Sequence, residues 1–409
     1  MRLIHCSLFA IVVLSAMTSL WASEPIDVGD RVCLFLDDHF VASRNNLERQ
    51  WHSGEPHPTA ILIPDKPWEG WVFMYGSVLY EPKQKRFRMW YQSWDGSLNY
   101  KVCYAESSDG LTWKKPELGL WEYDGSKQYN IVIPGCAMPN VFIDPLPKIG
   151  DPLKMFVWAA SHPDKTIHRH SLFSSKDSLR WEYLGWRKFG LDCDSGRWIK
   201  DANVIRWDER NGRWAAAHRS WTKFPIGEKN DEWRRTVLST YSDRLLEGWS
   251  PLELVLKPDE FDDKTTSRLS QNPKKPDWSE LYGMPIFQYR NHELGMLSVL
   301  DLIDGSDRVI GGGRMELAFS HDGQQWHRTS PRVRLIESDP KRADLVAIYA
   351  MTTPPIERDD RLWVYYTEAN SMHPLRPSDR WTTCIRLATW RKDQSSGISS
   401  SGDDARGFG

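Results

Sequence analysis

The sequence predicts an all-β protein, a five-bladed β-propeller of four-stranded antiparallel blades. Three observations point to this fold. A turn motif of Ser, Asp, Gly and Trp recurs along the chain, and the copies lie about 70 residues apart, with the last interval nearer 80. Three short runs rich in aromatic and β-branched residues precede each copy. A self-similar period of this kind is the signature of a repeat architecture.

Each copy of the turn motif predicts the tip of a β-hairpin. Asp-Gly favours a tight turn because Gly accepts a positive φ, and Ser and Asp side chains can bond to nearby backbone amides. We therefore expect Asp109, Asp177 and Asp322 to be structural, and each Trp to open the outer strand of its blade. The copies are Ser107–Trp113, Ser175–Trp181, Ser242–Trp249 with one extra residue, and Ser320–Trp326.

Four blades follow from the runs that precede these tips, because short runs bounded by turn residues are typical of strands. The first blade has 77–80, 87–91 and 100–106. The second has 140–143, 154–159 and 169–173. The third has 202–207, 213–218 and 235–239, and the fourth has 285–289, 293–299 and 314–319.

The fifth blade is incomplete in the sequence. Its runs are Leu345–Tyr349, Arg361–Tyr366 and Thr383–Trp390, with no hairpin motif and no fourth strand after them. The N-terminal run Arg31–Leu36 is a strand without a blade. We expect this run to complete the fifth blade and close the ring, because closure removes an open sheet edge.

Three segments make up the predicted domain organisation. Residues 1–22 have a short basic start, an apolar run and a small residue at the break, which predicts a signal peptide and a secreted or periplasmic protein. A retained membrane anchor is the alternative. Residues 24–392 form the propeller domain, and the Ser-, Gly- and Asp-rich tail 393–409 is expected to be disordered.

Composition excludes some partners. The formal net charge of −2 gives no basic footprint for nucleic acid, and no segment after the signal peptide predicts membrane binding. Cys33, Cys103 and Cys384 lie in predicted strands, whereas Cys136 and Cys193 lie in loops, where a disulfide is left open. No metal-ligand spacing is present, so no cofactor is expected, and calcium in the axial funnel is left open.

The chain has 22 Trp residues, which have two competing interpretations. The first is architectural, because the hairpin motif and the strands themselves use Trp. The second is that Trp residues in loops stack on sugar rings. Loop candidates are Trp51, Trp68, Trp71, Trp94, Trp198, Trp221, Trp233, Trp278 and Trp381.

The run Tyr75–Tyr80 followed by Phe87–Tyr91, together with the recurring hairpins, resembles the five-bladed propeller glycosidases. This superfamily contains invertases, arabinanases, xylosidases and mannoside phosphorylases. The opening Leu36–Val41 and the segment Pro67–Gly70 are similar to uncharacterised secreted members from polysaccharide-degrading aquatic bacteria. The resemblance covers about residues 31 to 391, and it specifies the fold better than the activity.

The resemblance implies a site in the axial funnel, with three carboxylates at the mouths of the inner strands. One must be protonated and another ionised for hydrolysis. This sequence departs from that pattern. Asp201 is the only acid at an expected position, while Tyr75, Asn140, Tyr282 and Tyr349 stand at the others, where we expect them to contact substrate.

The remaining acids must therefore come from elsewhere. Candidate catalytic residues are Asp201, Glu316, Glu368 and His373, with Asp37 and Asp38 as further acids. Candidate substrate-binding residues are Arg219, which could bind an acidic sugar, and Trp68 and Glu69 in the loop before the first blade.

The leading hypothesis is a secreted, monomeric glycoside hydrolase that acts on plant or algal polysaccharides or oligosaccharides by carboxylate acid/base catalysis. A non-catalytic carbohydrate-binding propeller is the alternative, and the missing acid in the first blade favours it. A structural envelope protein is a third reading, which would have no carboxylates clustered in the funnel.

Overall fold

Antiparallel β-sheet makes up most of the regular structure in this computed structural model. The helix α1 (Glu260–Thr266) is the sole helix among the residues that the structure describes. These residues are 33–41, 43, 45–96, 100–167, 169–186, 198–226, 229–266, 277–302, 310–337, 347–350, 352, 354–370, 382–392 and 396–400. None of the described helices is long and apolar enough to cross a membrane.

Three separate sheets have four antiparallel strands each, paired in chain order. The first contains β3 (Trp71–Glu81), β4 (Arg86–Trp94), β5 (Tyr100–Ser107) and β6 (Ile131–Pro134). The second contains β7 (Cys136–Ile143), β8 (Leu153–Ala159), β9 (His170–Ser175) and β10 (Glu182–Trp186). The third contains β11 (Trp198–Asp208), β12 (Arg213–Ile226), β13 (Lys229–Ser242) and β14 (Glu253–Leu256).

The remaining blade strands form two groups, which a single parallel pair, Gly313 with Ala347, joins into one larger sheet. In each group, the first two strands in chain order both pair with the third. One group has β15 (Trp278–Gly283), β16 (Ile286–Tyr289), β17 (His292–Leu302), β18 (Ile310–Ser320) and β19 (His327–Arg328). The other has β20 (Ala347–Tyr349), β21 (Ile356–Arg358), β22 (Arg361–Ala369), β23 (Thr383–Arg391) and β2 (Glu55–Pro56).

The strand expected at Arg31–Leu36 is not where the sequence predicts it. Residues 31 and 32 lie outside the described part, and 33–36 have no strand structure. Leu34 and Leu36 instead pack as buried core side chains. The N-terminal segment does add an outer strand to the last group, but this strand is β2, which pairs antiparallel with β23 through Glu55 and Pro56.

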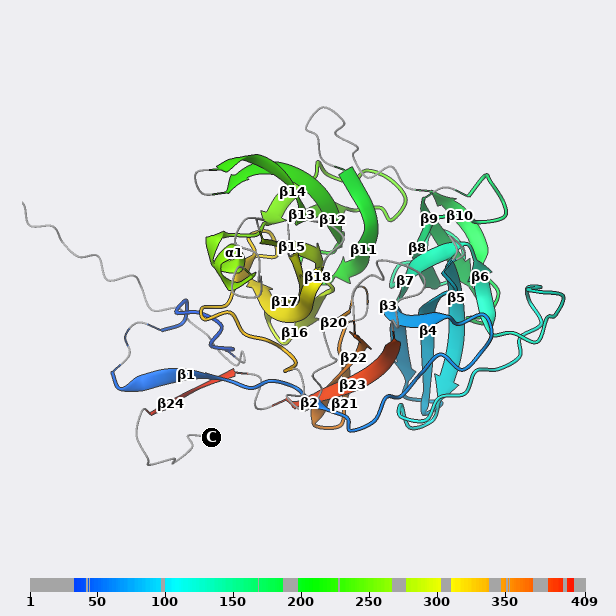
Figure 1. Cartoon of the computed structure of the whole chain (residues 1–409), viewed down its shortest axis with the longest axis horizontal. Helices are drawn as coiled ribbons and strands as arrows, with labels where there is room; N and C mark the ends of the chain where they lie inside the picture. Colours follow the sequence, from blue (N-terminus) through cyan, green and yellow to red (C-terminus); the bar gives the residue numbers. More distant parts are fainter. Residues whose placement is uncertain are drawn as a thin grey trace, which may run out of the picture.

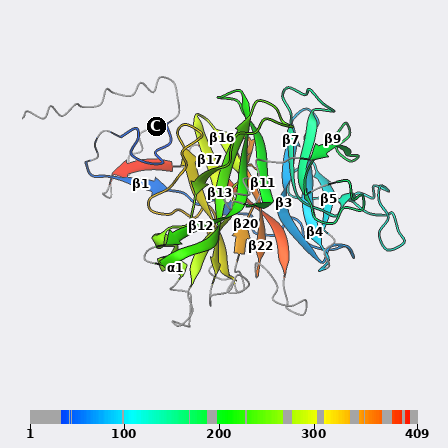
Figure 2. The same cartoon turned by 90° about the horizontal axis from the view of Figure 1, so that it is seen from above.

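Within the tail that the sequence predicts to be disordered, residues 396–400 form a paired strand. β24 (Ser396–Ser400) pairs antiparallel with β1 (Leu47–Trp51) along five residue pairs. Figures 1 and 2 both show this pair at one side of the molecule, away from the larger sheets. Backbone hydrogen bonds form regardless of side-chain polarity, so a Ser- and Gly-rich segment can add to a strand edge that is available.

The hairpin tips have the expected geometry. In the first copy, Asp109 Oδ1 accepts from the amides of Leu111 and Thr112 at 2.8 and 2.7 Å, and Gly110 has φ +78°. The second and fourth outer strands begin directly after their motif Trp, as β10 and β19. The first does not, because β6 begins 18 residues after Trp113.

Figure 1 shows the sheets around a common centre. Hydrogen bonds from side chains join the innermost strands of neighbouring sheets. Ser77 Oγ on β3 donates to Pro139 O at 3.1 Å and accepts from Val141 N at 2.8 Å on β7. Asn140 Oδ1 on β7 accepts from Ile205 N on β11 at 2.7 Å. These bonds satisfy backbone groups that have no ladder partner across the gap between sheets.

Apolar clusters fill the spaces between successive sheets. One cluster joins Trp90 and Tyr104 of the first sheet to Met155 and Phe173 of the second. Other clusters join the second sheet to the third and the third to β15–β17. Each sheet therefore buries both faces, which explains why so many of its strand residues are apolar.

No disulfide joins any two of the four described cysteines, which are Cys33, Cys103, Cys136 and Cys384. Cys103 and Cys136 are buried, and burial raises the pKa of both. Cys136, one of the two cysteines of the disulfide left open, is enclosed in the core between the first two sheets. Cys193 lies outside the described residues.

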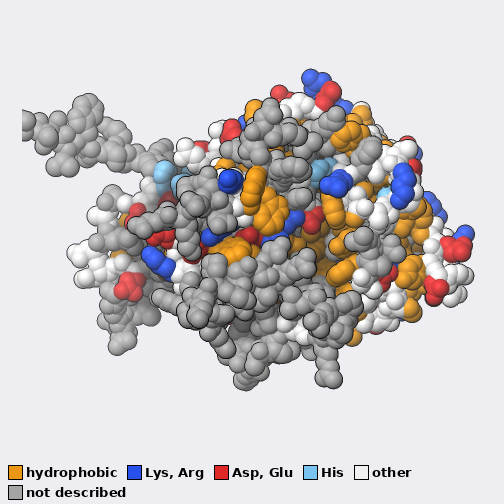
Figure 3. All heavy atoms as spheres, turned by 45° about the horizontal axis from the view of Figure 1, so that its top comes forward, with side chains coloured by type: hydrophobic (Ala, Val, Ile, Leu, Met, Phe, Trp, Pro, Cys, Tyr) orange, Lys and Arg blue, Asp and Glu red, His pale blue; other side chains and the backbone are white. Residues whose placement is uncertain are grey.

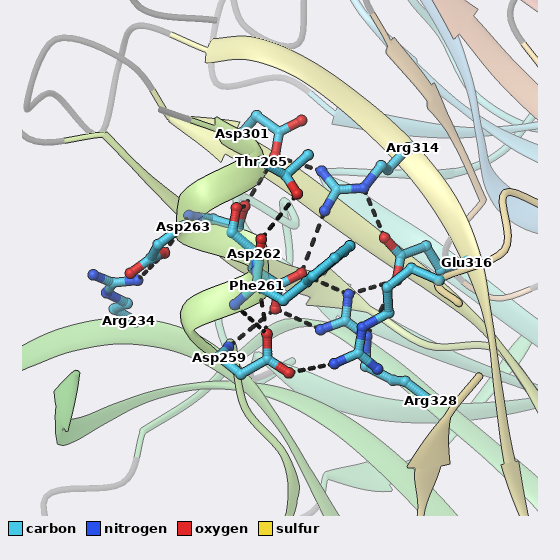
Figure 4. A network of polar contacts seen from close by, with 12 residues as sticks. Arg234, Asp259, Phe261, Asp262, Asp263, Thr265, Asp301, Arg314, Glu316 and Arg328 are labelled. Carbon is cyan, nitrogen blue, oxygen red and sulfur yellow. Dashed lines mark hydrogen bonds and ion pairs between the residues drawn. The ribbon is translucent and has the colours of Figure 1, made fainter. Parts of the chain in front are cut away.

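A buried ionic network fixes helix α1 against β17, β18 and β19 (Figure 4). Asp262 is fully buried and accepts from Arg328 at 2.5 and 2.7 Å and from Arg314 at 3.3 Å. Arg314 also contacts Asp301 and Glu316. Burial opposes ionisation of Asp262, but the two guanidinium groups outweigh it and hold its pKa below the usual value.

We predict that Asp262→Asn lowers the free energy of unfolding by about 3 to 5 kcal/mol, because it leaves buried guanidinium groups without their carboxylate. Glu260→Gln on the same helix is the matched control. Its pair with Lys264 is exposed and should contribute less than about 1 kcal/mol. Urea unfolding of both variants checks this, and equal losses would contradict the account.

The hairpin tips predict a dependence of stability on acid pH. Burial slightly opposes ionisation of Asp109, but hydrogen bonds from Thr112 and Leu111 lower its pKa from 3.8 to about 2. A depressed folded-state pKa stabilises the fold above the unfolded value, and this contribution is lost as pH falls from 3.8 to about 2. Asp109→Asn keeps an acceptor but cannot titrate.

We therefore expect Asp109→Asn to flatten the fall of the urea midpoint between about pH 4 and pH 2. Asp359→Asn should leave the slope unchanged, since that exposed carboxylate pairs only loosely with Arg358 at 3.6 Å. A wild-type slope in the Asp109→Asn variant would rule out a titrating role for this turn.

Candidate functional site

Four of the innermost strands contain a register shift near their middle. The shifts lie between Phe73 and Ser77 in β3, Ala137 and Asn140 in β7, Ile199 and Asn203 in β11, and Leu281 and Gly283 in β15. A bulge re-aims the side chains of the extra residues. The residues inside the four shifts that meet in one pocket are Tyr75, Met138, Asp201 and Tyr282.

This cavity, the Asp201 pocket, has a volume of about 70 Å³ and mostly aromatic walls. Asp201 is the sole carboxylate among its described lining residues. Trp94 is one of the loop Trp residues that the sequence offers for stacking on a sugar ring. Tyr100 and Trp158 lie in predicted strands and are not among the predicted site residues. The full lining is Phe73, Tyr75, Gln92, Trp94, Tyr100, Ala137, Met138, Trp158, Asp201 and Tyr282.

Three tyrosines from different inner strands lie together beside the pocket, and two of them, Tyr75 and Tyr282, line it. The ring centroid of Tyr75 lies 5.2 Å from that of Tyr349 and 6.3 Å from that of Tyr282. Burial raises the pKa of all three phenols. They are therefore neutral hydroxyl groups, as suits a site that recognises uncharged hydroxyls.

Asp201 forms an ion pair with Arg219, so the structure brings these two sequence candidates together. The Asp201 side chain is 21% exposed, whereas that of Arg219 is 8% exposed. The guanidinium of Arg219 lies 5.1 Å from the ring centroid of Tyr282. The carboxylate thus keeps access to the pocket while its partner is held against the wall.

A second ion pair, Arg235 with Glu280, also lies beside Tyr282. The Arg235 guanidinium is 4.5 Å from the Trp221 ring and 5.7 Å from the Tyr282 ring. Glu280 also accepts from Trp278 Nε1 at 3.2 Å. On the face drawn in Figure 3, hydrophobic side chains likewise lie beside charged ones.

The sequence reasoning missed Arg235 and Glu280. The signal was present in part, because Glu280 precedes the candidate Tyr282 by two residues and so shares its side of an extended strand. Arg235 could not be paired with Trp221 without knowing the register of the β12–β13 hairpin, which extends well beyond its neighbours.

The structure places the other two predicted acids outside the Asp201 pocket. Glu316 belongs to the buried ionic network of α1, where it contacts Arg314 at 2.7 Å and Arg328 at 2.5 Å. Glu368 pairs with Arg386 at 3.0 Å, and Arg386 also donates to the carbonyls of residues 57 and 58. Both acids are occupied in holding segments together. His373 lies outside the described residues.

Three of the predicted substrate-binding residues make internal contacts with other parts of the fold. Trp68 Nε1 donates to Asn130 Oδ1 at 3.0 Å. Glu69 is buried, where it contacts Lys115 at 2.6 Å and accepts from the Tyr91 hydroxyl. Burial is the largest cause of its raised pKa. Asn140 accepts from β11 as described above. None of the three lines the Asp201 pocket.

The two N-terminal acids lie at another place. Asp37 pairs with His321 at 2.9 Å, and Asp38 pairs with Arg49 at 2.7 Å. Neither lines the Asp201 pocket. Within the described residues, no group of three His, Cys, Asp or Glu side chains lies close enough to hold a metal ion.

Comparison with known proteins finds structures with a similar fold but no relative by sequence. No family model matches the chain, and no curated protein matches it in sequence. Several solved structures are similar in shape. A glycoside hydrolase has a TM-score of 0.50 at 14% identity, covering 82% of this chain and 92% of its own.

Two further solved structures have a similar fold. A thermostable family-43 glycoside hydrolase has a TM-score of 0.50 at 14% identity, and the β-1,2-mannobiose phosphorylase from Listeria innocua has 0.51 at 12%. Each match covers 83% of this chain and 97% of the other. At this identity the likeness concerns the fold alone. The chain therefore has the fold of the propeller glycosidases.

Proposed function

We propose that this protein is a secreted enzyme that cleaves glycosidic bonds in plant or algal polysaccharides or oligosaccharides, with Asp201 as its acid/base. The observation that carries the proposal is the Asp201 pocket itself. Its one described carboxylate stands among aromatic walls and neutral phenols, at the point where four inner-strand bulges meet. Aromatic faces and a few convergent polar groups are what a sugar-binding pocket requires.

The proposal includes a closed ring of five blades. Contacts between the last group and the first sheet support it. Thr367 Oγ1 accepts from Met74 N at 2.7 Å, and Thr383 Oγ1 accepts from Val72 N at 2.9 Å. Apolar residues of β22, β23 and the first sheet also share one core cluster. In this proposal residues 24–392 are the propeller, preceded by a signal peptide at 1–22, and the protein works as a monomer.

The cleavage step needs a proton donor and a nucleophile. Asp201 can transfer a proton to the leaving oxygen or accept one from an attacking hydroxyl. Hydrolysis by two carboxyl groups requires a second acid in the pocket. Glu280 stands two residues before Tyr282 of the pocket, but its side chain is 1% exposed and held by Arg235.

A nucleophile that is itself an anion would not need a second carboxylate. Arg219 and Arg235 are guanidinium groups beside Tyr282, and guanidinium binds phosphate well. One of the structurally similar proteins is named a phosphorylase. Cleavage by inorganic phosphate is therefore part of the proposal to be tested beside hydrolysis by water.

A non-catalytic carbohydrate-binding propeller is the second candidate. One specific observation favours it, namely that the sole described carboxylate of the pocket is already paired with Arg219. In that case the aromatic walls would bind sugar and Asp201 would only hold Arg219 in place.

We predict that Asp201→Asn lowers kcat/KM for glycoside cleavage by about 100-fold or more, because acid/base catalysis contributes about 10²- to 10⁴-fold. Product release from arabinan, xylan, laminarin and galactomannan is measured with and without inorganic phosphate. Asp124→Asn, in an exposed loop, is the control and should keep full activity.

Three outcomes separate the candidates. Loss of cleavage in Asp201→Asn supports the enzyme, and a requirement for phosphate identifies the nucleophile. Undiminished cleavage by Asp201→Asn removes this residue from the chemistry. Binding of a polysaccharide without any cleavage by the wild-type protein would leave the binding propeller as the function.

A further inference from the structure

A second pocket lies on the outer side of the molecule, between β6 of the first sheet and β9–β10 of the second. This cavity, the Trp121 pocket, has a volume of about 330 Å³, within the range of about 300 to 1,000 Å³ typical of small-ligand sites. It shares no lining residue with the Asp201 pocket. The lining residues used below are Trp121, His162, Arg180, Trp181 and Tyr183.

Trp121 is a large ring left partly in water. It is 37% exposed, and its Nε1 donates to Val132 O at 2.9 Å, which fixes the ring against β6. It meets His162 edge-on, with centroids 6.3 Å apart. The fixed, partly exposed ring is therefore available to stack on a ligand in the pocket.

His162 supplies a hydrogen-bond donor. Burial lowers its pKa, so the imidazole is neutral at physiological pH. Its Nδ1 accepts from Asp164 N at 3.1 Å, which places the single ring hydrogen on Nε2. The ring therefore offers one N–H donor of defined position, and no charge.

Trp181 has a donor without an acceptor among the described residues. In the first and third hairpin copies, the motif Trp indole donates back to its own turn, at Gly110 O and Leu245 O. In the second copy, the carbonyl equivalent to that of Gly110 belongs to Ser178 and accepts from Trp90 at 3.0 Å. Trp181 Nε1 is thus left buried and without an acceptor among the described residues, so Trp181 presents ring surface and no donor to the pocket.

The only charged side chain in the described lining of the pocket is offset by a carboxylate beside it. Arg180 is the one cation in the lining, and Asp177 holds it at 3.0 Å. Tyr183 adds a phenol and a further ring at the wall. Aromatic faces with neutral donors suit an uncharged ligand that has both C–H faces and hydroxyl acceptors.

From this combination we propose that the Trp121 pocket is a carbohydrate-binding site separate from the Asp201 pocket. One neutral sugar ring of a polysaccharide would stack on Trp121, and one of its hydroxyls would accept from His162 Nε2. The site would hold the polymer while the other pocket acts on it. Its binding does not depend on the chemistry proposed for Asp201.

Affinity electrophoresis tests this proposal, in native gels that contain laminarin, xylan, arabinan or galactomannan. We expect the wild-type protein to be retarded by at least one of these polymers. Trp121→Ala should weaken that binding by about fivefold or more, as loss of a stacked ring implies. Trp121→Phe, which keeps a ring, should retain more of it.

Trp186→Ala is the matched control, because Trp186 is 40% exposed and does not line the pocket. It should migrate as the wild type does. Thermal unfolding confirms that each variant is folded. Equal retardation of Trp121→Ala and wild type, or no retardation of wild type in any gel, would overturn the proposal. Asp201→Asn should keep its Trp121-dependent retardation even if no cleavage is ever observed, which separates the two proposals.

Discussion

The structure depends on bulges in its inner strands that are bridged from sheet to sheet. A bulge breaks the ladder and leaves backbone groups without partners, which is costly when they are buried. Ser77 donates to Pro139 O inside the bulge of β7, and Ser77 and Asn140 also accept from the amides of Val141 and Ile205 on neighbouring inner strands. The same bulges turn Tyr75, Asp201 and Tyr282 toward one pocket. The device that holds the sheets together therefore also builds the candidate site.

The charged residues divide into two kinds. Buried acids such as Asp262, Glu316 and Glu368 are each held by arginines that tie one chain segment to another. Asp201 differs, since it pairs with Arg219 and still keeps a fifth of its side chain exposed in an aromatic pocket. Buried ion pairs of the first kind fix geometry, whereas a carboxylate with access to a cavity can take part in chemistry.

Much of the fold could be predicted from the sequence, because a hairpin motif of Ser, Asp and Gly encodes its turn within four residues. Asp201 could be named as a candidate because the resemblance implies an acid at the mouth of an inner strand, and Asp201 stands at the mouth of a predicted strand. Glu316 and Glu368 could not, because strand alternation says which residues share a face but not which arginine covers that face. The outer strand β6 was missed because it begins 18 residues after Trp113 and not directly after the motif Trp. The Arg235–Glu280 pair depends on a contact between β13 and β15 that no local pattern encodes.

The central claim is that the Asp201 pocket is where the glycan is bound for cleavage. A crystal structure of Asp201→Asn with an oligosaccharide prepared from the most responsive polysaccharide tests it most directly. The account predicts a sugar ring against Trp94 and Tyr100, with a glycosidic oxygen within hydrogen-bond distance of the residue 201 side chain. A sugar bound elsewhere, with the Asp201 pocket empty, would contradict it.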